Sequence, residues 1–375
     1  MEYEGAAVIT ERGLNRALLA RQGLLTPYTA PPAQVVGSVG ALQTQYWPSL
    51  LPALVSRTSG LTAERVYREL AAGRLLVGTL LRGTIHTVTA EEYPAYAAVT
   101  AGSKVGHLRR PANVPDHATD ELRAELRAFT ARPRTPEQVY EFAESWVRRH
   151  PGVFDDEELA YQRSSKWRPF CTKVGLLRVP ADGRWDSKTP RGLLAAPTDR
   201  PEDALEIVIR AHLRAYGPAA AEDVASWIGW NIGPVREAVT AMSDLDNVTD
   251  EAGRTLYDLP DAPRPDPDVE APVRLLPWFD SALLAYAPKR RTRILPEAYQ
   301  EIVWLRRNGQ LKPTVLVDGL VAGSWALTST RSTVTLVVTP LRKLTRRGHA
   351  ALTEEAERLL AGTHPDADHE ITIEP

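Results

Sequence analysis

Two glutamines separated by one residue are the side chains whose type and spacing could do chemistry in this sequence. Gln43, Thr44 and Gln45 lie in a segment between Arg21 and Arg57 that contains no charged side chain and no histidine. Five prolines interrupt the segment, so it cannot be a membrane helix, and we expect it to be buried in the protein. Both amides then need partners, because a buried unpaired amide costs about 1–3 kcal/mol.

The glutamine pair admits two interpretations. In the first, both amides satisfy backbone groups of a loop near Pro48. In the second, they converge on one site. Residues two apart point about 200° apart around an α-helix, so convergence requires an extended chain, which Pro48 favours at Trp47. An amide exchanges no proton near neutral pH, but its oxygen can orient water and place a negative dipole beside a developing cation.

The composition is typical of a soluble protein with more than one core. The chain has 375 residues, of which 43% are hydrophobic and 25% charged. Its formal net charge of -2 excludes a uniformly basic coat for nucleic acid. The N-terminus has no basic leader before an apolar run, and no stretch of about 18 apolar residues occurs, so we expect a cytoplasmic protein without a membrane segment.

The sequence predicts a site without a metal and without a cofactor. Cys171 is the only cysteine, which excludes an internal disulfide and a cysteine-rich metal site. The eight histidines lack metal-ligand spacing, and no glycine-rich phosphate loop precedes a helix.

Positive charge is concentrated toward the C-terminus. Residues 271–347 contain 13 Lys or Arg against 4 acids, whereas residues 242–270 contain 2 Arg against 9 acids. Such segregation is typical of a protein with one face on phosphate, although solvated surfaces give the same count. The candidate phosphate contacts are Lys289, Arg290, Arg291 and Arg293, and further clusters are Arg306 with Arg307, Arg342 with Lys343, and Arg346 with Arg347.

The pattern of helices and strands predicts an α+β fold with three tandem winged-helix units and a strand-rich domain. Each unit has a helix-turn-helix followed by a short strand pair. We expect the units at residues 1–115, 116–198 and 199–262. After a proline-rich linker, residues 271–375 should form a β-barrel-like domain closed by one helix.

Local signals set several details of this organisation. Thr135 and Gln138 predict a capping box, and Asp318-Gly319 predicts a hairpin turn. Residues 328–333 read as a polar hairpin tip, where Arg331 either enters a DNA groove or only completes the turn. Residues 364–369 are expected to form a solvated tail.

Several blocks together resemble one known family. Gln43-Thr44-Gln45 resembles the Gln-x-Gln motif of the AlkZ-like DNA glycosylases, relatives of the bacterial YcaQ proteins. Residues 82–88, RGTIHTV, are similar to the family's Arg-x-Thr-x-His-x-Val stretch, and residues 275–286 look like its Leu-Leu-Pro-x-Phe-Asp block. Residues 317–319 and 323–325 also match its C-terminal domain. Thr44 departs from the family, which usually carries an apolar residue there.

The resemblance implies winged-helix units and a β-barrel arranged in a C shape around duplex DNA. It implies excision of alkylated bases with Gln43 and Gln45 as catalytic residues at the reacting sugar. His86 is then a candidate contact to DNA or to the sugar, or else a structural residue, because it shares one strand face with Thr84 and Val88. The expected partner is double-stranded DNA with alkylated bases, bound by a monomer at the nucleoid.

Neutral glutamines fit a leaving group that is already activated. Glycoside hydrolysis usually relies on carboxylates as acid and base or nucleophile, and an amide supplies neither. A purine alkylated at N7 or N3 carries positive charge and departs neutral. We therefore expect a DNA glycosylase for cationic alkylpurines, including bulky adducts and crosslinks. No lysine precedes Lys104, so no amine for lyase chemistry adjoins the motif in sequence, and we expect a monofunctional enzyme.

Two other functions fit parts of the sequence. A tandem winged-helix transcription regulator, which binds DNA without chemistry, explains the repeats equally well but not the paired glutamines in a charge-free segment. A resistance protein that sequesters a planar drug would use the nine tryptophans, but nothing in the sequence places them together.

Overall fold

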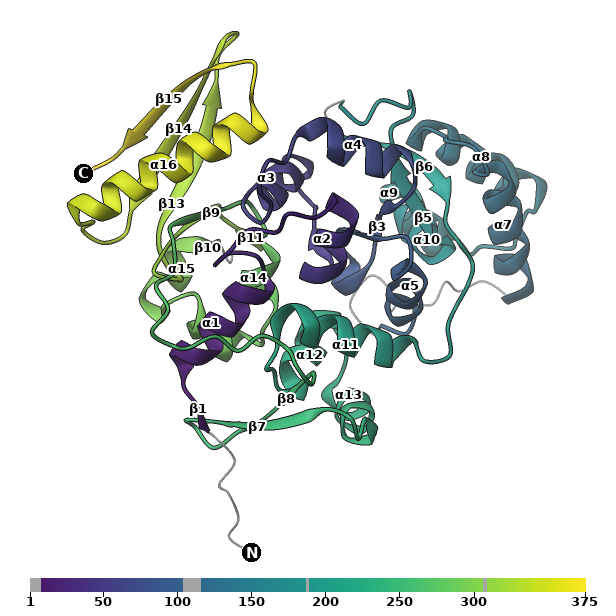
Figure 1. Cartoon of the computed structure of the whole chain (residues 1–375). Coiled ribbons are helices and arrows are strands. Elements are labelled where there is room, and N and C mark those ends of the chain that lie inside the picture. The colour runs from purple at the N-terminus through teal and green to yellow at the C-terminus, as the bar shows by residue number, and fades with distance from the viewer. Residues whose placement is uncertain (1–7, 104–115, 187–188, 306–308) are drawn as a thin grey trace, which may run out of the picture.

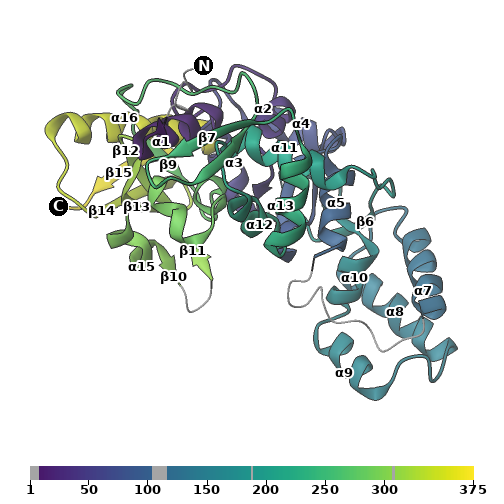
Figure 2. The same cartoon turned by 90° about the horizontal axis from the view of Figure 1, so that it is seen from below.

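The structure, a computed structural model, describes residues 8–103, 116–186, 189–305 and 309–375. It is a mixed α+β fold, as expected, in which helices surround several small sheets (Figure 1). Seen from below, the molecule has an arched outline, because the helices of residues 116–174 and the short elements of residues 300–305 and 310–311 project to the same side (Figure 2). Among the described residues, no helix is both long and apolar enough to span a bilayer.

The first unit contains the helices and strands that carry the glutamine pair. Thr10 caps the first helix by accepting from the Gly13 amide, and Gly40, at a φ of 78°, ends the second just before the motif. Thr62 precedes α4 but makes no side-chain capping bond. The elements are α1 (Glu11–Arg21), α2 (Pro32–Val39), β2 (Leu42–Gln43), the 3₁₀ helix η1 (Trp47–Ser49), α3 (Leu50–Val55), α4 (Ala63–Ala71), β3 (Leu75–Thr79), the 3₁₀ helix η2 (Leu81–Gly83), β4 (Ile85–Thr89) and α5 (Tyr93–Ala101).

The expected hairpin of β3 and β4 forms, but its sheet continues into the second predicted unit. The strand order is β2-β4-β3-β5-β6, where β5 is Leu176–Val179 and β6 is Gly192–Ala195. β3 pairs with β5 through Gly78 and Leu177. Two strand pairs that the sequence presents as separate wings therefore share one five-stranded sheet.

The second unit forms the projecting lobe of helices in Figure 2, and its capping box of Thr135 and Gln138 is confirmed. An aromatic core of Trp146, Phe154 and Trp167 holds the lobe together. Its helices are α7 (Asp116–Phe129), α8 (Pro136–Arg149), α9 (Asp156–Ser164) and α10 (Arg168–Val174).

The third unit supplies the central helix of the molecule. That helix, α11, packs against α1, α2, α5 and α13, and its His212 and Tyr216 are buried against Trp227. The unit's strand pair gains a third strand from the N-terminus, since β1 pairs in parallel with β7. The elements are β1 (Val8–Ile9), α11 (Ala204–Tyr216), α12 (Ala221–Ile228), α13 (Ile232–Ala241), β7 (Asp246–Asp250) and β8 (Thr255–Asp258).

The C-terminal region is an open sheet, which corrects the predicted β-barrel. The strand order is β15-β14-β13-β12-β9, so in the described chain β9 and β15 are opposite edges that do not meet. One helix, α16, packs on β9, β14 and β15 and buries the apolar face that closure would otherwise enclose. The strands and helix are β9 (Arg274–Leu276), β12 (Thr314–Val317), β13 (Leu320–Ser329), β14 (Thr333–Pro340), α16 (Arg346–Thr363) and β15 (Asp368–Ile373).

The predicted solvated tail is also wrong in part. Residues Asp368–Ile373 form β15, which pairs in parallel with β14 after the α16 crossover. The turn at Asp318-Gly319 and the hairpin tip between β13 and β14 form as expected. Between β9 and β12 lie α14 (Ser281–Leu284), the 3₁₀ helices η3 (Pro288–Arg293) and η4 (Glu297–Tyr299), α15 (Gln300–Val303), β10 (Trp304–Leu305) and β11 (Gln310–Leu311).

Candidate active site

The glutamine motif lies at the edge of the five-stranded sheet in extended chain. β2 pairs antiparallel with β4, which places Gln43 directly opposite His86, and the Thr44 amide donates to the Ile85 carbonyl at 2.8 Å. Successive residues of an extended chain point to opposite sides. Gln43 and Gln45 are therefore able to face one site, as the second interpretation requires.

Thr44 lies inside the protein, 2% exposed, between the two glutamines. Its hydroxyl is 3.0 Å from the Thr87 hydroxyl on the neighbouring strand. A buried hydroxyl with such a partner carries little penalty. The threonine is thus compatible with a position where the family usually has an apolar residue.

Gln43 is held from three parts of the chain. Its Oε1 accepts from Nη2 of Arg82 at 2.7 Å, and Nη1 of Arg82 donates to the Trp227 carbonyl of α12. Its backbone amide donates to Oγ of Ser281 at 3.2 Å, and that hydroxyl donates to the Ala41 carbonyl at 3.0 Å. The side chain and the backbone of Gln43 are therefore both fixed.

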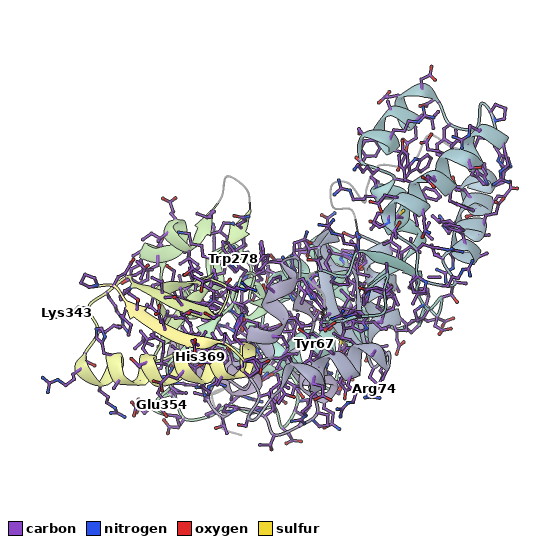
Figure 3. All side chains as sticks on the ribbon, turned by 90° about the horizontal axis from the view of Figure 1, so that it is seen from above. Tyr67, Arg74, Trp278, Lys343, Glu354 and His369 are labelled. Carbon is purple, nitrogen blue, oxygen red and sulfur yellow. The ribbon has the colours of Figure 1, made fainter. Side chains whose placement is uncertain are left out.

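Gln45 is exposed, and its Oε1 accepts from the Ile85 amide at 3.0 Å. The next residue, Tyr46, is 47% exposed, and its ring meets that of Trp278 edge-on with centroids 6.1 Å apart. Trp278 lies on the side of the molecule toward which the helical lobe and the region of β10 and β11 project (Figure 3). The exposed part of the motif therefore belongs to the inner side of the arch.

The partners of the two amide oxygens fix which way the amides point. A guanidinium and a backbone N–H are donors only, so the atom that each contacts must be the amide oxygen. The NH₂ groups of Gln43 and Gln45 consequently point away from these partners, and no described residue bonds to either of them.

Burial sets the charge of the two groups beside Gln43. Arg82 is partly buried, and desolvation lowers its pKa to about 10, so it stays cationic at neutral pH. His86 is 1% exposed, and desolvation together with the positive charge of Arg82 lowers its pKa to about 3. Its Nδ1 carries the proton, because it contacts the Thr84 carbonyl at 3.0 Å, and a carbonyl only accepts. His86 therefore lies in the protein as a neutral side chain, next to Gln43.

The residues behind Ser281 stiffen the motif further. Asp280 caps α14, and its two carboxylate oxygens accept from Arg57 at 2.8 and 2.9 Å, with both side chains fully buried. Arg57 also donates to Oε1 of Gln22. Arg82 and Ser281 were not among the predicted site residues, although each lies in or beside a block that carries the family resemblance.

The comparisons with known proteins give the family of this chain. The sequence matches the family described as DNA glycosylase AlkZ-like over residues 36–361, a range that contains the glutamine motif, Arg82 and Ser281. The chain belongs to this family.

Its relatives include a protein from Streptomyces sahachiroi named interstrand DNA cross-link repair glycosylase. The present chain is 28% identical to this relative over 348 residues, which are 88% of the present chain and 91% of the relative. The solved structure of Streptomyces sahachiroi DNA glycosylase AlkZ has a TM-score of 0.79 at 24% identity and covers 98% of this chain and 100% of that chain. The family match favours an enzyme over a regulator that only binds DNA.

The predicted phosphate contacts of this AlkZ-like chain differ in exposure. Lys289 is exposed on η3, whereas Arg290 lies 3.4 Å from both Glu222 and Asp223 of α12. Arg291 lies over the Trp304 ring at 4.1 Å, and desolvation lowers its pKa to about 10. The cluster is therefore only partly available to a ligand.

Arg293 is 3% exposed and points inward. It donates to the Pro218 carbonyl at 2.9 Å and lies over the Tyr286 ring. In this conformation its guanidinium is not available to a phosphate. The candidate cluster of Arg306 and Arg307 lies outside the described residues.

Arg331 is exposed at the tip between β13 and β14. Two hollows of about 390 and 410 Å³ separate this hairpin from the first unit, and both are lined by Tyr67 and His364. Tyr46 borders one hollow and Arg331 the other. The hairpin tip and the residue that follows Gln45 thus border two hollows that share lining residues.

Among the described residues, no group of three or more His, Cys, Asp or Glu side chains is arranged to hold a metal ion.

Proposed function

We propose that this glycosylase hydrolyses the N-glycosidic bond of purines that carry an alkyl group at N7 or N3 in duplex DNA. The observation that supports this most is the absence of a free acid among the described contacts of Gln43 and Gln45. The carboxylate next to Ser281, Asp280, has both oxygens occupied by Arg57. A site without a proton donor of this kind suits a base that leaves without being protonated.

The reaction needs only a positioned water molecule. The C1′–N9 bond breaks, and its electron pair enters the purine ring, where it cancels the positive charge introduced by alkylation. The water oxygen bonds to C1′ and gives its proton to solvent. The products are a neutral alkylated base and an abasic sugar with a hydroxyl at C1′. Each oriented dipole that favours this charge movement is worth about 10²-fold or more in rate.

The arched outline and the open edge of the motif support action on bulky adducts and on crosslinks. Gln45 is exposed, and the next residue, Tyr46, lines a hollow at the surface. A relative with a similar chain is named for interstrand crosslink repair. We expect a monomer that acts on nucleoid DNA in the cytoplasm.

We further propose that the reaction stops at the abasic site. Strand scission by lyase chemistry requires an amine that attacks C1′. No described lysine hydrogen-bonds to Gln43 or Gln45. The groups that bond to their side chains or to the Gln43 amide include the Arg82 guanidinium, the Ser281 hydroxyl and the Ile85 backbone amide.

The test is incubation with a duplex that contains one N7-methylguanine. We expect release of free N7-methylguanine, with strand breaks only after alkali and no covalent adduct after borohydride treatment. Gln43→Ala and Gln45→Ala should each slow single-turnover release by about 10²-fold. Gln34→Ala, an exposed glutamine on α2, is the matched control and should not. No base release by the parent enzyme would refute the proposed activity, and a trapped adduct would refute the monofunctional reaction alone.

A further inference from the structure

The amide of Gln43 is oriented so that its donor end is the free one. Oε1 is occupied by Arg82 at 2.7 Å, and Nε2 has no hydrogen-bond partner in the described part of the chain. Gln43 is 9% exposed, so its amide is also confined by the protein around it. The NH₂ group is therefore the end of this amide that has no protein partner and is left to bond a substrate.

Arg82 also makes that NH₂ group a stronger donor. A hydrogen bond from a cation to an amide oxygen is charge-assisted, and hydrogen bonds in a chain polarise one another. The second nitrogen of the same guanidinium is anchored on the Trp227 carbonyl, so the cation cannot turn away from Gln43. The same polarisation is absent at Gln45, whose oxygen accepts from a neutral backbone amide.

We propose that Gln43, positioned by Arg82, donates a hydrogen bond from its NH₂ group to N3 of the purine that is leaving. This inference rests on the proposed glycosylase activity and assigns the partner of one catalytic residue. N3 and N9 are both bonded to C4, so N3 gains electron density as the electron pair of the C1′–N9 bond moves into the ring. A donor at N3 is therefore stronger in the transition state than in the ground state, which is the condition for catalysis.

The assignment also narrows the substrate class. A purine alkylated at N7 retains the N3 lone pair, whereas an alkyl group at N3 removes it. Gln43 can therefore assist the first class and not the second. We expect the enzyme to release N7-alkylpurines faster than N3-alkylpurines, after each rate is divided by that of spontaneous loss from the same duplex.

The first test replaces Gln43 by glutamate. Gln43→Glu has the same length and keeps an oxygen for Arg82, but an ionised carboxylate cannot donate. We expect it to lose about 10- to 100-fold in single-turnover release of N7-methylguanine, as Gln43→Ala does. If the oxygen of Gln43 acted on the sugar cation instead, a carboxylate would serve at least as well, and a rate equal to or above that of the parent enzyme overturns the proposal. Gln34→Glu on the surface of α2 is the control.

The second test removes the acceptor. In a 3-deaza analogue of N7-methylguanine, N3 is replaced by C–H. The parent enzyme should lose about 10- to 100-fold on this substrate, relative to its spontaneous loss, whereas Gln43→Ala and Arg82→Gly should lose little more. A purely structural effect of Arg82 would slow both substrates alike.

The outcomes separate this inference from the proposed function. If the parent enzyme releases neither substrate, the proposed function fails and the inference fails with it. If it releases both equally well after correction for spontaneous loss, the function stands and the role of Gln43 toward N3 is overturned.

Discussion

Arg82 is the residue whose replacement best separates stability from activity. Its backbone has a φ of 56°, in the left-handed region that glycine adopts without strain. Arg82→Gly removes the guanidinium from Gln43 and Trp227 while it suits the backbone. We expect base release to fall by about 10- to 100-fold with a small change in the free energy of unfolding.

The magnitude follows from opposing contributions. Burial lowers the pKa of Arg82 to about 10, which at about 1.4 kcal/mol per pKa unit opposes the charged form by up to roughly 3 kcal/mol. The left-handed backbone adds about 1 kcal/mol. Two hydrogen bonds from a charged group restore about 3–6 kcal/mol. The sum lies within about 2 kcal/mol of zero, so the side chain contributes little net stability.

The assay pairs urea unfolding with single-turnover release of N7-methylguanine. Asp261→Gly is the matched control, because Asp261 is exposed and has a φ of 61°. That variant should change the free energy of unfolding by about 1 kcal/mol or less and leave the rate unchanged. The reasoning is refuted if Arg82→Gly costs clearly more than 2 kcal/mol of stability while the folded fraction releases base at the rate of the parent enzyme.

Three further predictions concern DNA affinity, pH and the hairpin. Lys289→Ala should make the log–log salt dependence of duplex affinity shallower by about 0.9, whereas an unchanged slope would mean that Lys289 lies off the DNA. Burial lowers the pKa of His86 to about 3 and that of His212 to about 4. Below about pH 6.5 both histidines are therefore protonated in the unfolded chain while they stay neutral in the native protein. The free energy of unfolding should therefore decrease from pH 7 to pH 5 by up to about 2 kcal/mol for each histidine. In urea unfolding, His212→Phe should lose the part of this decrease that His212 causes. Arg331→Ala should slow release of bulky adducts more than it weakens binding to undamaged duplex. Equal losses in both would mean that the hairpin only binds the DNA backbone.

Elements that depend on local chemistry are predictable from this sequence. The capping box at Thr135, the hairpin of β3 and β4 and the turn at Asp318-Gly319 all form where the residue types require them. In each case the interacting groups lie within about a dozen residues of one another, so one short stretch of sequence contains both of them.

Pairings between distant segments are not predictable in this way. β1 pairs with β7, and β3 pairs with β5, but no local sequence feature predicts either pairing. The C-terminal sheet stays open because α16 covers its apolar face and β15 returns beside β14, not beside β9. Alternating apolar residues set which faces are buried but do not choose between a barrel and a covered sheet.

The same distinction applies to the site. A charge-free segment draws attention to Gln43 and Gln45, but their amide directions depend on Arg82 and Ile85, which are 39 and 40 residues away. The cationic count of the C-terminal region likewise includes arginines that serve internal contacts. Arg293 is held by Pro218, and Arg274 lies 3.4 Å from Glu355. Charge along a sequence therefore overstates the charge available to DNA.

Contacts to Gln43 make the site a product of three predicted domains. The glutamine lies in the first unit, Arg82 anchors it on the Trp227 carbonyl of the third, and Ser281 of the C-terminal region bonds its backbone. The buried pair of Arg57 and Asp280 fixes Ser281 in place, and removal of one partner would leave an uncompensated charge that costs about 3–5 kcal/mol. Separation of the chain at the proline-rich linker would therefore disrupt the motif even where the first unit stayed folded. The position of Gln43 therefore depends on the assembled fold, because Trp227 and Ser281, which hold Arg82 and the Gln43 backbone, belong to other predicted domains.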